Sequence, residues 1–503
     1  MNDKRSVTAH DVAKGAGTTL LARLGALIEV VAQPLYVWMF GLATFGLYAV
    51  LWAAVNLVEN VADLGMTSAM QRVVPQARSE AEAVSALRSA LLLGVGPCIV
   101  VAALVSAGAG QVAPLFLVSA IRLFAWALPL WAFVEIATSA LRARRAFGPE
   151  IRLRILWEQL FRLALALAFW LAGVSTLALF YAHLASLSVI GLLCLRLLSR
   201  HYDLSLLFAG RLFDAPFHES WRAGLAVLPA NSVARLFGDG PPLALNALIP
   251  GGGGAVAGGL FVIARKIARL VQILRTAFAY VLSPLASHAS LSPGGEVGVI
   301  YGFATRVLVA VSLPLGMVLA SAAPAVLRLF GADARPAMAA VVLLVLARTV
   351  DAVLGAAAPI QQVISGYRQQ LLPSLAGLAV AAALAAMLLP DGDGLTAMAV
   401  AVGGGIAMTA GLPVFQLWRH DGLHPFTRSF WRVFATALAI GAGGAALAHL
   451  ALLAPTAAEL PLLVPLMLLS IWFSARFALP FADRAALGAL AREARLVIAA
   501  FAR

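Results

Sequence analysis

Long, uninterrupted apolar segments recur along nearly the whole sequence, and they constrain the fold more than any other feature. Of the 503 residues, 62% are hydrophobic and only 12% are charged, whereas an average globular domain is about 25% charged. An apolar segment of about 20 residues crosses the hydrocarbon core of a bilayer as an α-helix. The segments lack the two-residue alternation of barrel strands, so we predict an all-α integral membrane protein.

The apolar segments predict about fourteen transmembrane helices. They cover residues 18–40, 43–70, 86–107, 114–141, 152–172, 174–198, 221–248, 254–284, 302–326, 337–365, 370–389, 395–418, 430–453 and 459–480. We expect two six-helix lobes, residues 1–200 and 201–425, around a central cavity. Two additional helices within 426–482 and an amphipathic cytoplasmic tail, 483–503, would follow.

The distribution of basic residues predicts the orientation in the membrane. Arg and Lys concentrate in alternate loops, such as 71–88 and 142–154, while the intervening loops contain little that is basic beyond Arg328 and Arg335. Cytoplasmic loops carry this excess of basic residues, so both termini are expected in the cytoplasm. The net charge of +13 then needs no nucleic acid as a partner, because no soluble basic surface is present to bind one.

A weak internal repeat is visible. Residues 46–51 (GLYAVL) open the second predicted helix, residues 259–264 (GLFVIA) lie near the start of the eighth, and each helix runs on to a proline, Pro75 or Pro284. Two six-helix halves in parallel orientation would produce such a repeat. Chance similarity between apolar segments is the alternative.

The eighth predicted helix contains the most unusual charges. Arg265, Arg269 and Gln272 fall within a narrow arc of the helix, with Arg275 and Lys266 on its flanks. A charge in the middle of a bilayer costs about 2.5–3.5 kcal/mol or more, and this helix contains no acidic residue. We therefore predict a water-filled cavity that receives an anion, and phosphate or pyrophosphate suits paired guanidinium groups. Alternatively, acids on other helices, such as Glu29, Glu59 or Asp63, pair with these residues.

Several other charged residues are spaced as local ion pairs with a structural role. These pairs are Arg235 with Asp239, Arg348 with Asp351, and Arg162 with Glu158. Arg23, near the inner end of the first helix, either snorkels to the surface or forms part of the anion site.

Prolines and glycines mark two helices. Pro34 lies within the first helix, and the sequence 238–242 (GDGPP) is expected to interrupt the seventh. Both helices are predicted to bend during transport, and a static kink is the alternative.

No catalytic, metal or cofactor site is predicted. The sequence has no zinc-protease motif and no phosphate-binding glycine loop, and the outer loops are short. Cys98 and Cys194 lie in apolar segments without metal-ligand spacing. His183 also lies in an apolar helix and is interpreted as a packed polar residue. An enzyme is therefore not expected.

The segment from Gly41 to Pro75 resembles the second-helix region of Wzx-type polysaccharide flippases of the multidrug/oligosaccharidyl-lipid/polysaccharide exporter superfamily. Its pattern is a Gly-Leu-Tyr start, then residues 63–65 (DLG), Arg72 and Pro75. Residues 257–287 resemble the eighth helix of these proteins, and residues 329–331 (LFG) with 365–368 (SGYR) also fit. The resemblance extends over most of the first twelve predicted helices.

The resemblance implies a flippase that moves an undecaprenyl-diphosphate-linked oligosaccharide across the bacterial cytoplasmic membrane by alternating access. It places Arg23, Arg265 and Arg269 at positions comparable to diphosphate-binding arginines, and the charge pattern adds Arg275. A coupling cation or proton is a further expected partner. The candidates for coupling or gating are Glu29, Glu59, Asp63, Arg235 and Asp239.

Two other functions are considered. A cation-coupled drug or small-molecule exporter of the same superfamily would favour an acidic, aromatic cavity over an arginine-rich one. A membrane polysaccharide polymerase or ligase would need a large outer loop with catalytic residues, which the sequence lacks.

Overall fold

The structure is a computed structural model that describes residues 9–112, 115–144, 146, 151–174, 177–209, 211–276, 279, 296–390, 392–453 and 455–485. The described residues form helices and connections without strands, which confirms the all-α fold. Ten helices within this part of the chain are long and apolar enough to cross a membrane. The larger number expected from the sequence stays a prediction. Of the amphipathic tail, only residues 483–485 are described.

The chain divides into two compact units, residues 20–259 and residues 260–503 together with 1–19. The helices up to this division are α1 (Ala9–Ala62), α2 (Met66–Gln76), α3 (Glu80–Ala90), η1 (Leu91–Val95), α4 (Gly96–Val112), α5 (Leu115–Phe124), α6 (Ala127–Ala143), η2 (Ile151–Trp157), α8 (Glu158–Leu171), α9 (Ala178–His201), η3 (Leu204–Phe208) and α10 (Ala215–Leu248). Helix α11 (Gly252–Arg269) contains the division itself. Within the first of these units, α10 packs against α2 and α3. The two six-helix lobes, 1–200 and 201–425, stay a prediction.

Helix α1 consists of two helices that meet at Gly41. Its backbone there has φ 80° and ψ 158°, which glycine adopts readily, and this break lies between the first two predicted helices. The second of these does not continue to residue 70 as predicted. It ends at Ala62 and is followed by a turn with positive φ at Leu64 and Gly65. Asp63 therefore lies in a turn rather than on a continuous helix.

The close packing of glycines explains the turn after α1. A Cβ on Gly65 would lie 3.1 Å from the Cα of Gly224 on α10, so α10 approaches the turn backbone to backbone. Gly65 also has φ 75°, a conformation that other residues rarely adopt. The Asp-Leu-Gly pattern thus forms the point at which α2 turns away and contacts α10.

Helix α10 is continuous from residue 215 to residue 248, so the predicted interruption at 238–242 is wrong. Pro241 and Pro242 remove two backbone donors, but the remaining hydrogen bonds and the packing against α2 and α3 maintain the helix. Tertiary packing often outweighs local helix propensity in this way. The bending of α10 during transport stays a prediction.

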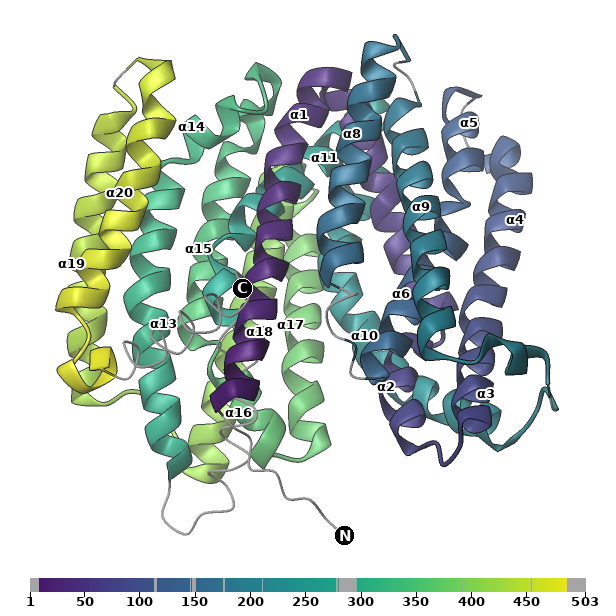
Figure 1. Ribbon diagram of the computed structural model, residues 1–503. Helices are drawn as coiled ribbons and strands as arrows, with labels where there is room; N and C mark the ends of the chain where they lie inside the picture. Colours follow the sequence, from purple (N-terminus) through teal and green to yellow (C-terminus); the bar gives the residue numbers. More distant parts are fainter. Residues whose placement is uncertain are drawn as a thin grey trace, which may run out of the picture. The chain divides into compact units, whose positions relative to one another are not determined.

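The second unit contains the remaining helices. These are α13 (Glu296–Ser321), α14 (Ala323–Arg328), η4 (Ala332–Ala337), α15 (Met338–Leu354), α16 (Ala357–Ile364), α17 (Tyr367–Leu388), α18 (Gly394–Asp421), α19 (Arg428–Ala451) and α20 (Thr456–Phe477). Helices α13, α19 and α20 pack side by side (Figure 1), and α18 packs against both α15 and α17.

Large apolar side chains remain exposed along helices of both units. They include Trp38, Leu104, Leu171, Leu192, Leu468 and Trp472. A soluble protein rarely exposes so much apolar surface, whereas lipid chains would cover it in a bilayer. The described chain is therefore a multi-pass membrane protein.

Candidate functional site

The polar side chains of the eighth predicted helix form two groups, one on α11 and one after its end. Arg265 is buried and Arg269 is exposed at the last turn of α11. A non-helical turn at residues 270–271 then interrupts the helix, and residues 272–276 are helical again. Gln272 therefore does not continue the arc of Arg265 and Arg269 as predicted. The turn separates the first group from Gln272 and Arg275.

Gln272 and Arg275 instead contact Asp351 on α15. Arg275 Nη1 lies 2.6 Å from Asp351 Oδ2, and Gln272 donates a hydrogen bond to the same oxygen. Arg348 lies one helical turn before Asp351 and contacts it at 3.4 Å, so the predicted local pair is confirmed. An acid on another helix, Asp351, therefore neutralises part of the basic group.

Acidic candidates for coupling are buried in the first unit. Glu59, Asp63 and Asp239 are all less than a tenth exposed. Asp63 Oδ2 accepts a hydrogen bond from the backbone N–H of Thr67 at 3.3 Å. The charges of Asp63 and Glu135 act on Glu59, so three carboxyl groups share one buried region.

Two guanidinium groups accompany these acids. Arg154 forms an ion pair with Glu135, and Arg235 Nη1 lies 3.9 Å from Asp239 Oδ2, which confirms the second predicted local pair. The side chains of Arg23 and Glu29 lie outside the described residues.

A buried polar network in the first unit extends beyond the predicted pair of Glu158 and Arg162. Arg162 Nη1 donates to the hydroxyl of Tyr48 at 2.9 Å, and this hydroxyl is hydrogen-bonded to His183 Nδ1 at 3.0 Å. Arg162 Nε lies 3.5 Å from Glu158 Oε1, and the same carboxylate oxygen is 3.6 Å from His183 Nε2. All four side chains are buried.

Aromatic rings enclose this network. The ring of Trp52 lies 4.2 Å from that of His183, and Phe124 and Phe180 also pack around Tyr48. The spacing of Glu158 and Arg162 indicated their pairing. No sequence signal connects them with Tyr48, because its helix lies far earlier in the chain.

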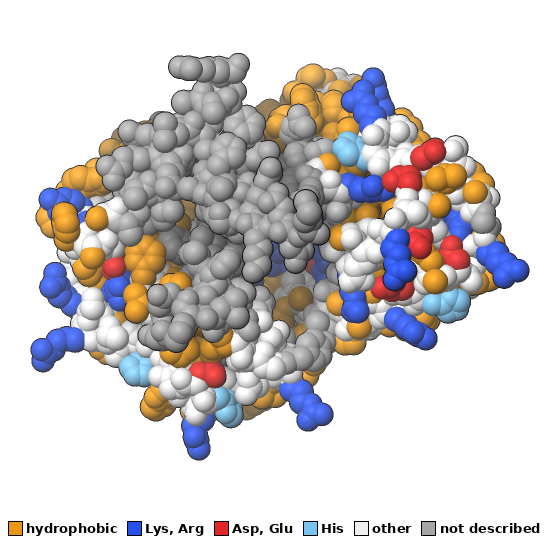
Figure 2. All heavy atoms as spheres, turned by 60° about the horizontal axis from the view of Figure 1, so that its bottom comes forward, with side chains coloured by type: hydrophobic (Ala, Val, Ile, Leu, Met, Phe, Trp, Pro, Cys, Tyr) orange, Lys and Arg blue, Asp and Glu red, His pale blue; other side chains and the backbone are white. Residues whose placement is uncertain are grey.

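One end of the first unit presents polar and basic side chains. A pocket of about 360 Å³ is lined by residues that include Arg78, Ser79, Glu80 and Arg144. Arg144 forms an ion pair with Glu80 at 2.6 Å and stacks over the ring of Tyr202 at 4.6 Å. Figure 2 shows basic side chains, with some acidic ones, gathered at this end of the unit.

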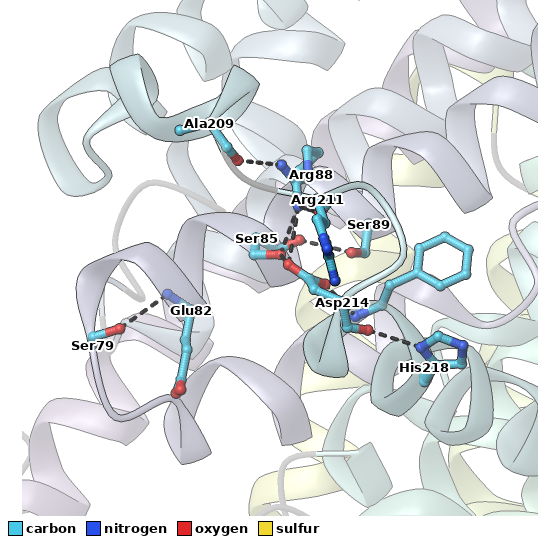
Figure 3. A network of polar contacts seen from close by, with 10 residues as sticks. Ser79, Glu82, Ser85, Arg88, Ser89, Ala209, Arg211, Asp214 and His218 are labelled. Atoms are coloured by element: carbon cyan, nitrogen blue, oxygen red, sulfur yellow. Dashed lines mark hydrogen bonds and ion pairs between the residues drawn. The ribbon is translucent and has the colours of Figure 1, made fainter.

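A second network fixes the connection that leads into α10. Arg88 of α3 donates to the carbonyl oxygens of Ala209 and Arg211 at 2.5 Å and to Asp214 Oδ2 at 3.0 Å (Figure 3). Asp214 also accepts a hydrogen bond from the backbone N–H of Phe217, and so caps the first turn of α10. Arg88 therefore orients the start of α10 against α3.

The described side chains do not suggest a metal centre. Among them, no three His, Cys, Asp or Glu residues are grouped so that they could hold a metal ion. The available polar chemistry consists of guanidinium groups, carboxyl groups and one enclosed imidazole. Such groups can bind an anion or exchange a proton.

One known protein family has a sequence model that matches more than half of the chain. Residues 12–290 match the sequence model of a family described as "Polysaccharide biosynthesis protein". No curated protein sequence matches the chain significantly.

Solved structures of membrane transporters share the fold. An inward-facing multidrug resistance MATE family transporter of the MOP superfamily is 16% identical, with a TM-score of 0.63 over 82% of this chain and 98% of that one. The lipid II flippase MurJ in an inward closed conformation is 12% identical, with a TM-score of 0.65 over 92% of this chain and 97% of that one. An outward-facing MATE transporter is 15% identical, with a TM-score of 0.60 over 84% and 98%. At these identities the likeness shows the fold.

Proposed function

Because the chain belongs to the polysaccharide biosynthesis protein family and has the MOP-superfamily fold, we propose that it is a lipid-linked oligosaccharide flippase. Its substrate would be an undecaprenyl-diphosphate-linked oligosaccharide, which moves from the inner to the outer face of the bacterial cytoplasmic membrane by alternating access. Both chain termini would lie in the cytoplasm. The structures that the chain resembles are transporters and a flippase rather than enzymes.

The group of basic side chains on and after α11 carries this proposal. Arg265, Lys266, Arg269 and Arg275 lie within a short stretch of a chain that is otherwise strongly apolar. Guanidinium groups bind phosphate oxygens through paired hydrogen bonds. A diphosphate headgroup would compensate for the cost of keeping these charges within the membrane, while the prenyl chain stays in lipid. Arg23 is the fourth arginine that we assign to this site.

The experiment replaces Arg265 and Arg269 with Gln in one variant. Flipping of undecaprenyl-diphosphate-linked oligosaccharide is measured in proteoliposomes, and surface polysaccharide is measured in cells. We expect loss of both activities with normal amounts of folded protein. Arg335→Gln, an exposed arginine in a predicted outer loop, removes one charge as a control and should leave flipping intact. Normal flipping in the double variant would refute the assigned site.

The buried acids of the first unit would couple transport to a cation gradient. Glu59, Asp63 and Glu135 place three carboxyl groups in one buried region. Of the two guanidinium groups beside them, Arg154 pairs with Glu135 and Arg235 lies 3.9 Å from Asp239. Buried charges of one sign are costly, so one of these carboxyl groups is expected to hold a proton or a cation during transport. Glu29, Arg235 and Asp239 would contribute to gating.

The coupling role is tested separately from binding. Flipping by Glu59→Gln and Asp63→Asn proteoliposomes is measured with and without an imposed proton or sodium gradient. Loss of gradient stimulation, with diphosphate binding unchanged, would support the role of these acids. Equal stimulation in wild type and both variants would exclude it.

The same acids favour one alternative, a cation-coupled exporter of drugs or other small molecules. A buried acidic and aromatic region, such as that of Glu135 and Trp131 on either side of Arg154, would suit a cationic substrate. Drug tolerance in a strain that lacks its own pumps separates the two functions. A flippase would not restore tolerance, whereas an exporter would.

A further inference from the structure

Asp351 occupies a central position among the basic side chains of the second unit. Its carboxylate accepts from Arg275 at 2.6 Å and from Gln272, and it contacts Arg348 at 3.4 Å. The side chain of Asp351 is 6% exposed, while those of Arg275 and Arg348 are 27% and 21% exposed. The acid is therefore enclosed, and the two arginines retain faces that another anion can reach.

The arginines have hydrogen-bonding capacity beyond this one carboxylate. Each guanidinium group has five N–H donors. Among the described residues, the buried Nε of Arg275 has no hydrogen-bond acceptor. Arg348 contacts Asp351 only at the long distance given above. The positive charges of Arg269 and Arg275 also act on Arg348. One carboxylate thus faces two guanidinium groups, those of Arg275 and Arg348, so these three side chains carry a net positive charge.

The backbone around Asp351 is shaped to admit Arg275. Gly355 follows α15, and a Cβ at this position would lie 2.6 Å from Cδ of Arg275. Because Gly355 has no side chain, the aliphatic part of the Arg275 side chain can lie against the end of α15. The side chains of Arg275 and Gln272 therefore both join the segment after α11 to Asp351 of α15.

We propose that Asp351 is an internal competitor for the substrate's diphosphate, and that Arg348 is an additional phosphate-binding residue. In the unloaded protein, Asp351 holds Arg275 and Arg348 in place of phosphate. On binding, the diphosphate oxygens replace the carboxylate on these guanidinium groups, and on release Asp351 takes them back. The exchange requires no covalent step. This inference rests on the proposed function, since it concerns the same diphosphate site.

This role differs from that of a structural ion pair in the direction of its effect. A structural partner positions Arg275, so its removal would weaken ligand binding. A competitor lowers affinity, so its removal would strengthen binding and slow release. Asp351→Asn distinguishes the two because the amide keeps the shape of the side chain and removes its charge.

The experiment measures binding of undecaprenyl diphosphate and undecaprenyl monophosphate to the full-length protein in detergent. We expect Asp351→Asn to tighten diphosphate binding about five- to tenfold, a usual size for coupling between two ligands, and to change monophosphate binding less. Flipping in proteoliposomes should slow, because release is impaired. Unchanged or weaker diphosphate binding in this variant would overturn the inference.

Asp483→Asn is the matched control. Asp483 forms a two-point ion pair with Arg306 at 2.6 and 2.9 Å in the same unit, and this pair shares no residue with the Asp351 cluster. The same chemical change there should leave diphosphate affinity unchanged. Tighter binding in this control as well would show a general charge effect and would count against the assignment.

Arg348→Gln provides a test that does not depend on the Asp351 variant being stable. If Arg348 binds phosphate, its replacement weakens diphosphate binding at least fivefold, both in wild type and in the Asp351→Asn background. If Arg348 serves only Asp351, the replacement has no effect once that charge is gone, and the inference fails. A wild-type protein that does not prefer diphosphate over monophosphate would instead refute the proposed function itself.

Discussion

Gly46 and Gly259 touch backbone to backbone where α1 crosses α11. A Cβ on Gly259 would lie only 2.5 Å from the Cα of Gly46, and one on Gly46 would lie 3.2 Å from the Cα of Val256. These two glycines begin the two similar segments of the internal repeat. In addition, each of the two helices ends at a turn, α1 at residues 63–65 and α11 at residues 270–271. The two turns lie at different distances from these glycines, so the internal repeat stays a prediction.

Side chains at this crossing should therefore disrupt the packing of the two helices. We expect Gly259→Ala to destabilise the protein by about 1–3 kcal/mol, the usual cost of overpacking, because the neighbouring atoms are backbone and cannot rotate away. Thermal unfolding in detergent measures the change. Gly443→Ala is the control, since nothing lies near that position on α19. It should be neutral or stabilising, as Gly to Ala usually is within a helix. Equal behaviour of the two variants would contradict the close crossing.

The network of Glu158, Arg162, Tyr48 and His183 predicts that removing one buried charge greatly lowers the stability of the fold. Glu158→Gln would leave the buried guanidinium of Arg162 without its carboxylate partner. Such a loss costs about 3–5 kcal/mol, and the melting temperature should fall accordingly. By contrast, Glu80→Gln removes the partner of Arg144 at an exposed ion pair, where about 1 kcal/mol or less is expected. A smaller effect for Glu158 than for Glu80 would show that the network does not stabilise the fold.

The contacts of Arg88 predict how the connection before α10 is fixed. Arg88→Met removes four hydrogen bonds, those to Ser85, Ala209, Arg211 and Asp214, and leaves Asp214 without its charged partner. We expect a loss of about 3 kcal/mol in stability and faster proteolysis within residues 204–214. Limited proteolysis followed by mass spectrometry locates the cleavage. Arg78→Met, at an exposed position, should not alter the rate. Protection of the connection in the Arg88 variant would contradict this assignment.

Tyr202 predicts a loss of stability in alkaline solution. Burial raises the pKa of Tyr202 to about 12 from its ordinary value of 10.0, against the lowering effect of the Arg144 guanidinium. The unfolded chain therefore loses this proton first. The contribution of Tyr202 is fully present below pH 10 and is lost as the pH rises to about 12. Two pKa units correspond to about 2–3 kcal/mol.

The comparison with Tyr202→Phe isolates this contribution from that of other tyrosines. The variant loses the hydrogen bond to the carbonyl oxygen of Ala140, so it is expected to be less stable at pH 8. Its stability should then fall less steeply than that of wild type between pH 10 and 12. Parallel curves for the two proteins would show that Tyr202 does not titrate as expected.

Local sequence determined where most helices lie. Helices were predicted at 370–389 and 430–453, and the structure has them at Tyr367–Leu388 and Arg428–Ala451. The break at Gly41 also lies between two predicted helices. The physical reason is that a helix satisfies its backbone hydrogen bonds within a single segment. Its apolar length, which decides whether it can enter a bilayer, is a property of that segment alone.

The tertiary structure decided which distant polar residues are paired and where turns interrupt the predicted helices. His183 is hydrogen-bonded to Tyr48 across 135 residues of sequence, and Arg275 reaches Asp351 across 76. The basic arc was expected to continue through Gln272, but the turn at residues 270–271 directs Gln272 and Arg275 to α15. No local pattern encodes these partners, because a buried charge pairs with whichever opposite charge the packing of other helices brings within reach. The sequence therefore specified the helices, the costly charges and the ion pairs one helical turn apart, and only the packing specified which distant residues meet.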